Sequence, residues 1–444
     1  MIPTTVPDDA PPSPAPPQAI TRRHIVAATL GNALEFYDFT TYAFFAIQIG
    51  HAFFPAKGAF VSLMLSLATF GAGFITRPIG GIVIGAYADR VGRRAAMMLS
   101  FSLMGASILA LAIIPPYAQI GLAAPILAVI ARLAQGFSLG GEVGPNTAYL
   151  LEAAKPRGRG LMVSFQGASQ LISSMFGGLV GLGLTALLPH AALETYGWRI
   201  AFLLGAVTLP FGLLLRRTMP ETLHRPEPAG ARANSGAELG VLRANARVIT
   251  LGLMIIGGGT ITTYVTNYMT TFAQSSLHMA PAVAFAATWV PNGTGLAAIL
   301  SGGWLSDRIG RRPVMIWPKL AHLALLYPIF SWIVISRAPV ALLCGMAVLG
   351  AASAMGGGAI YAALIESLPK AVRGRTFATI YATAVAVFGG TTQPMVAWLI
   401  HITRNPMAPA WYMLGSSAIA LAAMTLMAES APVRQKSILA AQTG

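Results

Sequence analysis

Six ionisable side chains stand inside long apolar stretches of this sequence, where a charge is costly and for that reason usually functional. Three are carboxylates, which can take up and release a proton, and three are cations, which can attract an anion. The carboxylates are Glu35, Asp38 and Glu142, and the cations are Arg77, Arg132 and Lys319. Together they predict a site for an anion and a proton, with Glu35 or Asp38 as the proton carrier and Glu142 behind them.

Three of these side chains are expected at one depth. A helical rise of about 1.5 Å per residue places Arg77, Glu35 and Glu142 about 15 to 18 Å from the nearest helix ends, near the middle of a bilayer. Arg132 is expected further toward the outer side. The alternative is a buried charge network, in which an arginine neutralises a carboxylate and braces the helices. Lys319 can also extend along its helix to reach water.

Uncharged polar side chains accompany these charges. Gln166 and Gln170 share one face of a helix, and Asn267 and Tyr268 follow each other in another. We expect these four to line a cavity and to orient a ligand, whereas the threonines nearby are expected to join helices. His322 is interpreted as a core histidine or, alternatively, as a contact for a proton or a carboxylate.

A ten-residue pattern occurs twice, about half a chain apart. Gly85, Asp89, Arg90, Gly92, Arg93 and Arg94 are repeated with the same spacing as Gly303, Asp307, Arg308, Gly310, Arg311 and Arg312. A weaker echo relates Glu152 and Arg157 to Glu366 and Arg373. Such duplication is typical of transporters built from two similar halves. Each motif can simply anchor the chain by its positive charge, but the fixed Gly and Asp favour a conformational latch between helix ends.

Composition indicates a membrane protein. Apolar residues make up 55% of the chain and charged residues only 10%, against about 25% charged in soluble domains. Apolar runs of about 20 residues predict twelve transmembrane helices. We expect them near 24–50, 59–88, 95–114, 120–152, 160–188, 198–216, 247–274, 282–306, 313–336, 338–368, 376–402 and 409–429. Gly389, Gly390 and Pro394 are expected to bend the eleventh helix.

The cations also predict the orientation. With both termini inside, 22 Lys and Arg residues fall on the cytoplasmic side and four, Lys57, Arg199, Arg337 and Arg404, on the outer side. The predicted division is a cytoplasmic tail over 1–20, a six-helix bundle over 21–216, a cytoplasmic linker over 217–246, a second six-helix bundle over 247–430 and a tail over 431–444. The fold class is therefore an all-α membrane protein of two pseudo-symmetric bundles.

Other functions lack the residues they need. No spacing of His, Cys and carboxylates provides a nucleophile or a metal site, so we expect neither an enzyme nor a cofactor. The net charge of +15 sits in short clusters between apolar runs, which argues against nucleic-acid binding. The partners expected are the lipid bilayer, a small organic anion and a proton, with the protein acting as a monomer.

The repeated motif resembles that of the major facilitator superfamily, and the resemblance covers roughly residues 20–430. Further strings are similar to its metabolite–proton symporter branch, namely Gly31–Phe39, Arg77–Gly81 and Arg132–Glu142. Others look most like bacterial citrate–proton symporters, namely Phe53–Pro55, Ser62–Leu65, Gly85–Arg90 and Ser164–Gln170. The string Thr262–Tyr268 matches them less closely.

This resemblance implies a bacterial inner-membrane symporter that imports a small organic anion, citrate or a related tri- or dicarboxylate, together with protons. It implies alternating access of a central site to the two sides of the membrane. The branch also moves α-ketoglutarate, shikimate and zwitterionic compatible solutes, so these are the alternative substrates.

Overall fold

A computed structural model describes residues 22–91, 93–140, 147, 150–151, 154–217, 243–369 and 373–434. Within these ranges every element is a helix and no strand occurs. The predicted tail 1–20, most of the predicted linker 217–246 and most of the predicted tail 431–444 lie outside them, as does Glu142. The side chains of Glu35, Asp38, Asp89, Arg90, Arg93 and Arg94 also lie outside the described part, although their backbone is helical.

The first half of the chain forms helices α1 to α11. Their bounds are α1 Arg22–Phe44, α2 Ala46–Phe53, α3 Ala59–Ile75, α4 Arg77–Val91, α5 Arg93–Ile113, α6 Tyr117–Ile120, α7 Ala123–Leu139, η1 Pro156–Gly158, α9 Arg159–Leu187, α10 His190–Ala192, η2 Leu193–Gly197 and α11 Trp198–Arg217.

The second half forms helices α13 to α20. Their bounds are α13 Ala246–Ser275, α14 Pro281–Ile309, α15 Arg311–Ser336, α16 Pro339–Ala354, α17 Gly357–Glu366, α18 Arg373–Ala384, η3 Val385–Gly389, α19 Gly390–Thr403 and α20 Ala408–Leu426.

Eight helical stretches of the described chain have the length and hydropathy to cross a membrane, and two shorter apolar helices join them. Large apolar side chains are exposed around the outside of the bundle, for example Ile335 at 83%, Leu187 at 81% and Ile82 at 75%. An apolar surface of this kind suits contact with lipid.

Several predicted spans are interrupted rather than continuous. The span predicted over 59–88 divides at Thr76, because Pro78 has no N–H to donate to Phe74 and its ring crowds that carbonyl. The span predicted over 376–402 contains a π-helical turn, η3, which ends at Gly389, the first residue of the glycine pair that was expected to bend it. The Pro394 that follows in α19 also lacks an N–H, which favours such a local change of pitch.

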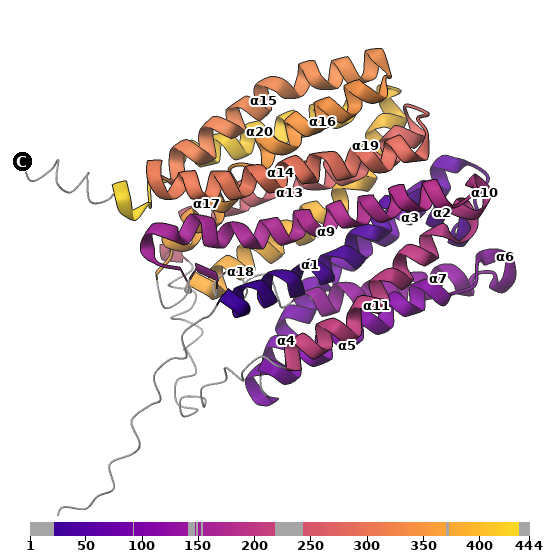
Figure 1. Cartoon of the computed structure of the whole chain (residues 1–444), viewed down its shortest axis with the longest axis horizontal. Coiled ribbons are helices and arrows are strands. Elements are labelled where there is room, and N and C mark those ends of the chain that lie inside the picture. Colours follow the sequence, from indigo (N-terminus) through magenta and orange to yellow (C-terminus); the bar gives the residue numbers. More distant parts are fainter. Residues whose placement is uncertain are drawn as a thin grey trace, which may run out of the picture.

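The helices run between two ends of one bundle (Figure 1). One, named here the Asp307 end, holds the end of α14 and the start of α9, since Asp307 accepts from the Gly160 N–H at 2.8 Å. The start of α13 and the end of α20 also lie there, joined by a hydrogen bond from Arg247 to the Leu426 carbonyl. The opposite end, at the end of α2, is named the His51 end.

The two halves of the chain pack along two main seams. In one, α9 lies beside α14, as Figure 1 shows, and Gly178 fits against the backbone of Trp289. In the other, α3 meets α19, where a Cβ at Gly71 would overlap the carbonyl oxygen of Gly390. Glycine allows these helices to approach more closely than any other residue would.

Candidate functional site

Arg77 and Arg132 share one aromatic neighbour. The guanidinium carbon of Arg77 lies 4.2 Å from the ring centre of Phe39, and that of Arg132 lies 4.6 Å from the same centre. Phe74 and Tyr42 also contact one guanidinium each, at 4.3 and 4.6 Å. Both arginines are buried, so the aromatic rings stabilise their charge where water does not.

The two guanidiniums keep hydrogen-bond donors to spare. Arg132 donates to the side-chain oxygen of Gln135 and, at 3.5 Å, to the carbonyl of Phe70. Its Nε, and the Nε and Nη2 of Arg77, have no hydrogen-bond partner among the described residues. Buried donors are normally satisfied, because leaving one unpaired is costly. These donors therefore suit a carboxylate ligand, which accepts from guanidinium groups in pairs.

The predicted proton carriers lie on the helix that provides Phe39. Glu35 and Asp38 belong to α1, and Asp38 directly precedes Phe39 in the chain. The structure places their backbone but does not describe their side chains. The alternative of a charge network between these carboxylates and the arginines therefore stays open, and no described carboxylate is paired with Arg77 or Arg132.

The two glutamines of α9 make different contacts. Gln166 donates to Asn32 of α1 at 3.3 Å, and Asn32 donates to Ser169 at 2.6 Å, so this group joins two helices of the first half. Gln170 instead donates to the hydroxyl of Tyr381 at 3.1 Å, which links the two halves of the chain. Gln170 therefore spans the region between the halves.

Asn267 and Tyr268 are buried in α13, one turn beyond the residue that meets the arginine cluster. That residue is Tyr264, whose ring lies 5.3 Å from Phe74, and it was not among the predicted site residues. The sequence presents Tyr264 as one of several polar residues in the same helix, but nothing in their spacing shows which of them meets Phe74. Tyr268 lines a separate cavity at the His51 end.

Lys319 and His322 lie one turn apart in α15, in the second half. Lys319 is buried, with 7% of its surface exposed. Both ring nitrogens of His322 lack a hydrogen-bond partner within the described chain. The described contacts of Arg77 and Arg132 involve other helices, so the structure shows no direct contact between these two groups.

The second copy of the repeated motif joins three helix ends. The carboxylate of Asp307 accepts from the backbone N–H groups of Gly160 and Leu161, at 2.8 and 3.0 Å, and from Arg311 at 2.8 Å. Arg311 also binds Glu366 through two nitrogens, at 3.2 and 3.1 Å. Arg159 approaches the same carboxylate at 3.8 Å. Ions buried together in this way hold the start of α9 against the ends of α14 and α17.

The other two arginines of this copy lie outside the cluster. Arg308 is exposed and stacks over Trp304 at 3.8 Å, and Arg312 donates to the Thr425 carbonyl at 2.8 Å. Glu429 accepts from the N–H groups that begin α15, a capping contact that the sequence analysis did not anticipate. In the first copy, α4 ends at Val91 and α5 begins at Arg93.

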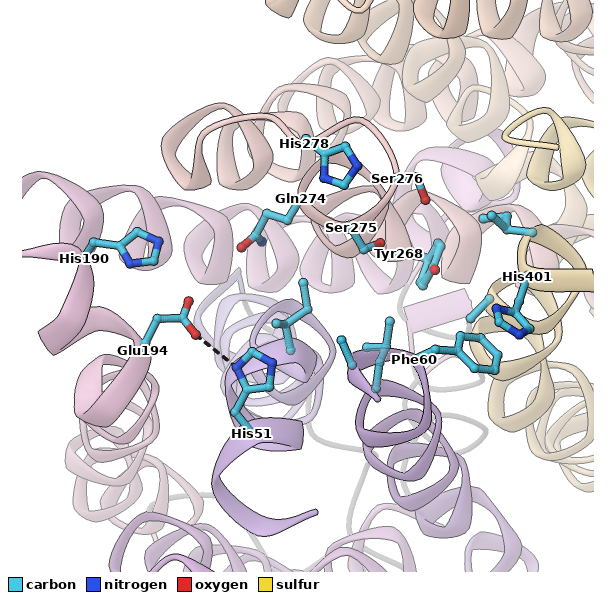
Figure 2. A pocket seen from close by; sticks show the side chains of 15 residues that line it. His51, Phe60, His190, Glu194, Tyr268, Gln274, Ser275, Ser276, His278 and His401 are labelled. Carbon is cyan, nitrogen blue, oxygen red and sulfur yellow. Dashed lines mark hydrogen bonds and ion pairs between the residues drawn. The ribbon is translucent and has the colours of Figure 1, made fainter. Parts of the chain in front are cut away.

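A cavity of about 610 Å³ opens at the His51 end, between residues of both halves (Figure 2). It is lined by Ile47, His51, Ala59, Phe60, Leu63, His190, Glu194, Tyr268, Gln274, Ser275, Ser276, His278, Ala397, Ile400 and His401. His401 stacks on Phe60 at 3.7 Å between ring centres, which joins the halves at this end. The structure thus shows direct contacts between the halves at both ends of the bundle.

Comparison with known proteins agrees with this architecture. A family model for the Major Facilitator Superfamily matches residues 28–391. A citrate-proton symporter of Salmonella typhi is 36% identical, over 94% of this chain and 96% of that protein. Another, of Klebsiella pneumoniae, is 38% identical over 88% of each chain. The solved structure of a D-xylose-proton symporter superposes with a TM-score of 0.72 at 20% identity, covering 92% of this chain and 98% of that one.

Proposed function

Because this chain belongs to the major facilitator superfamily and is a multi-pass membrane protein, we propose that it is a proton-coupled symporter. It imports a small organic anion, citrate or a related tri- or dicarboxylate, by alternating access. The relatives reported above support this class of substrate, since they are citrate-proton symporters similar to this chain over nearly its whole length. They are transporters and not enzymes.

The observation that carries the proposal is the pair of buried arginines around Phe39. Arg77 and Arg132 place two positive charges among aromatic rings with three unpaired donors between them. A polycarboxylate provides the charge and the paired acceptors that these donors lack. Gln170 donates a hydrogen bond to Tyr381 across the two halves, so in this proposal it couples ligand binding to their relative position. Gln166, Asn267 and Lys319 are further substrate contacts in this proposal, whereas Tyr268, the remaining predicted contact, lines the separate cavity at the His51 end.

Coupling rests on the carboxylates of the same region. A buried carboxylate holds its proton more tightly, and a nearby guanidinium makes it release that proton more readily. In the proposed mechanism an anion that occupies Arg77 or Arg132 weakens the influence of the arginine, so that Glu35 or Asp38 binds a proton at the same time. Glu142 provides the next proton position. The proton and the anion then increase each other's affinity by the same factor.

The latch proposed from the repeated motif acts at the Asp307 end. Asp307 and Arg311 bind the start of α9 and Glu366 while that end is closed, and release them when it opens. Asp89, Arg90, Arg93 and Arg94 do the same in the first copy, and Arg308 and Arg312 flank the second. By the positive-inside rule the Asp307 end is cytoplasmic, as are both termini. The membrane is the bacterial inner membrane, and the two six-helix bundles, 21–216 and 247–430, act as one monomer.

The test is transport by the purified protein in proteoliposomes. With an inward proton gradient, labelled citrate accumulates against its concentration gradient, and protons enter with it. A rate of citrate uptake that is the same with and without the proton gradient contradicts the coupling. Competition by unlabelled α-ketoglutarate, shikimate and a zwitterionic compatible solute shows which substrate the site prefers. If one of these compounds inhibits uptake more strongly than unlabelled citrate does, that compound is the substrate instead of citrate.

A further inference from the structure

Four of the seven histidines of the chain line the cavity at the His51 end. They come from both halves, with His51 at the end of α2, His190 at the start of α10, His278 between α13 and α14, and His401 in α19. Figure 2 shows them around one hollow. Arg77, Arg132 and Phe39 are not among the residues that line it. The volume of about 610 Å³ is that of a typical small-ligand site.

We propose that this cavity is a second binding site for carboxylate anions, in which protonated histidines hold the substrate before it reaches the arginines. The inference rests on the proposed function and on the outer position of the His51 end. Imidazole gains a positive charge between about pH 8 and pH 5. The cavity therefore becomes attractive to an anion under the acidic outer conditions that also drive a proton symporter.

The carboxylate in the cavity does not oppose this charge. Glu194 is bound at both oxygens, by Gln48 at 2.8 Å and by His51 at 3.4 Å. The hydrogen bond to Glu194 raises the pKa of His51, against the smaller opposing effect of its burial, so His51 and Glu194 form an ion pair with no net charge. The other three histidines of the lining, His190, His278 and His401, form no ion pair with a described carboxylate and are therefore available to an anion.

Other charged groups at this end do not face the cavity. Arg199 donates to the carbonyls of Ala112 and Ile114, each at 2.8 Å, and stacks over Trp198. Lys57 and Arg404 are exposed and are not among the lining residues. The remaining titratable group in the lining is the buried hydroxyl of Tyr268. The imidazoles therefore provide the pH-dependent charge of the cavity.

The rest of the lining suits a hydroxylated acid better than a metal ion. Ser275 donates its hydroxyl hydrogen to the Thr271 carbonyl at 2.8 Å, which leaves its oxygen able to accept from a ligand hydroxyl. Gln274 likewise donates to Thr270 at 3.1 Å. Among the described residues, no three His, Cys, Asp or Glu side chains are grouped to hold a metal.

The backbone at His278 offers a clean variant. Its φ of 54° lies in the left-handed region, which asparagine tolerates and most residues do not. His278→Asn therefore keeps the turn while it removes the titratable ring. His190 is exposed, so His190→Gln leaves the packing of the bundle unchanged. Lys57→Gln, which removes a cation at the same end but outside the cavity, is the matched control.

The experiment measures citrate exchange across proteoliposomes with equal pH on both sides. The double variant combines His190→Gln with His278→Asn. At about pH 5.5, where imidazoles are charged, it raises the KM for citrate on the outer side about three- to tenfold and leaves the maximal rate unchanged. At about pH 7.5 the two proteins have nearly the same KM. Lys57→Gln matches the wild type at both pH values.

Three results overturn the second site. These are an unchanged KM in the double variant at low pH, an equal change in Lys57→Gln, and a pH effect that a chelator abolishes, which would indicate a cation instead. Failure of the proposed function looks different, because then the wild type itself exchanges no organic acid. If the wild type exchanges citrate and the double variant has the same KM as the wild type, the second site is refuted and the proposed symport is not affected.

Discussion

The carboxylate of Asp307 accepts a hydrogen bond from the backbone N–H of Gly160 at 2.8 Å, across 147 residues of sequence. Leu161 adds a second bond at 3.0 Å, so a negative charge sits against the first N–H groups of α9. A helix start carries a partial positive charge and unpaired donors, which is why this contact is stabilising. It joins the first half of the chain to the second through an ion cluster rather than through apolar packing alone.

Asp307→Asn is expected to open the Asp307 end. The amide removes the charge and can accept through only one oxygen, a loss of about 1 to 3 kcal/mol for this contact. Amide hydrogen exchange of Gly160 and Leu161 becomes faster, and uptake becomes slower as the closed state loses stability. Arg308→Gln is the control, because Arg308 belongs to the same motif but is exposed and stacks over Trp304, outside the ion cluster. Equal protection of Gly160 in both variants would contradict the latch.

Arg77→Gln is expected to weaken anion binding. The variant keeps some donors but loses the charge that attracts a carboxylate, so KM for citrate rises about ten- to a hundredfold. Arg199→Gln provides a control, because Arg199 also stacks on an aromatic ring, Trp198 at 4.2 Å, but lies at the His51 end. A mild effect of Arg77→Gln, no larger than that of Arg199→Gln, would indicate a zwitterionic substrate.

Gly71→Ala is expected to separate α3 from α19. Its Cβ would overlap the carbonyl oxygen of Gly390, so the helices must move apart, at a cost of about 1 to 3 kcal/mol. The melting temperature and the transport rate both fall. Gly259→Ala in α13 meets no atom within 4 Å and should be neutral or slightly stabilising, since alanine favours helix by up to about 1 kcal/mol. Equal melting temperatures for the two variants would refute the tight seam.

His51 and Glu194 predict a small pH dependence of stability. The hydrogen bond to Glu194 raises the pKa of His51, so this contribution is complete below its ordinary value of 6.5 and is lost as pH rises through the higher folded value. Burial raises the pKa of Glu194, but hydrogen bonds from His51 and Gln48 hold it below its ordinary value of 4.5. The contribution of Glu194 is therefore complete above that value and is lost as pH falls further.

The pair thus stabilises the fold most between about pH 4.5 and 6.5. Because 53% of the His51 side chain is exposed, its worth is below about 0.5 kcal/mol. The measurement is the difference in melting temperature between wild type and His51→Gln across pH. A difference that grows above pH 7 has the wrong sign for this assignment.

Much of the helix pattern followed from hydropathy alone. The apolar runs predicted over 160–188 and 247–274 correspond to α9 at Arg159–Leu187 and α13 at Ala246–Ser275. Such runs are readable because the thickness of the bilayer fixes their length. The break at Thr76 was missed although Pro78 stood in the sequence, since a membrane helix can also absorb a proline as a kink.

The site was predictable only in part. An apolar stretch makes Arg77 and Arg132 conspicuous, but nothing in the spacing shows that both contact Phe39. Glu366 was visible only as a weak echo, and its pairing with Arg311 depends on how α15 and α17 meet in space. For Gln166, the sequence could not distinguish a cavity lining from the bond to Asn32, because a buried amide satisfies either role.

Phe39 makes the two arginines dependent on each other. The π electrons of Phe39 attract both guanidinium groups, and the two positive charges repel each other because they are bound to the same ring. An anion that pulls one guanidinium away leaves the ring to the other, which then settles more firmly. A single phenyl group can in this way turn the arrival of one carboxylate into a rearrangement of its neighbour, with no chain of moving helices in between.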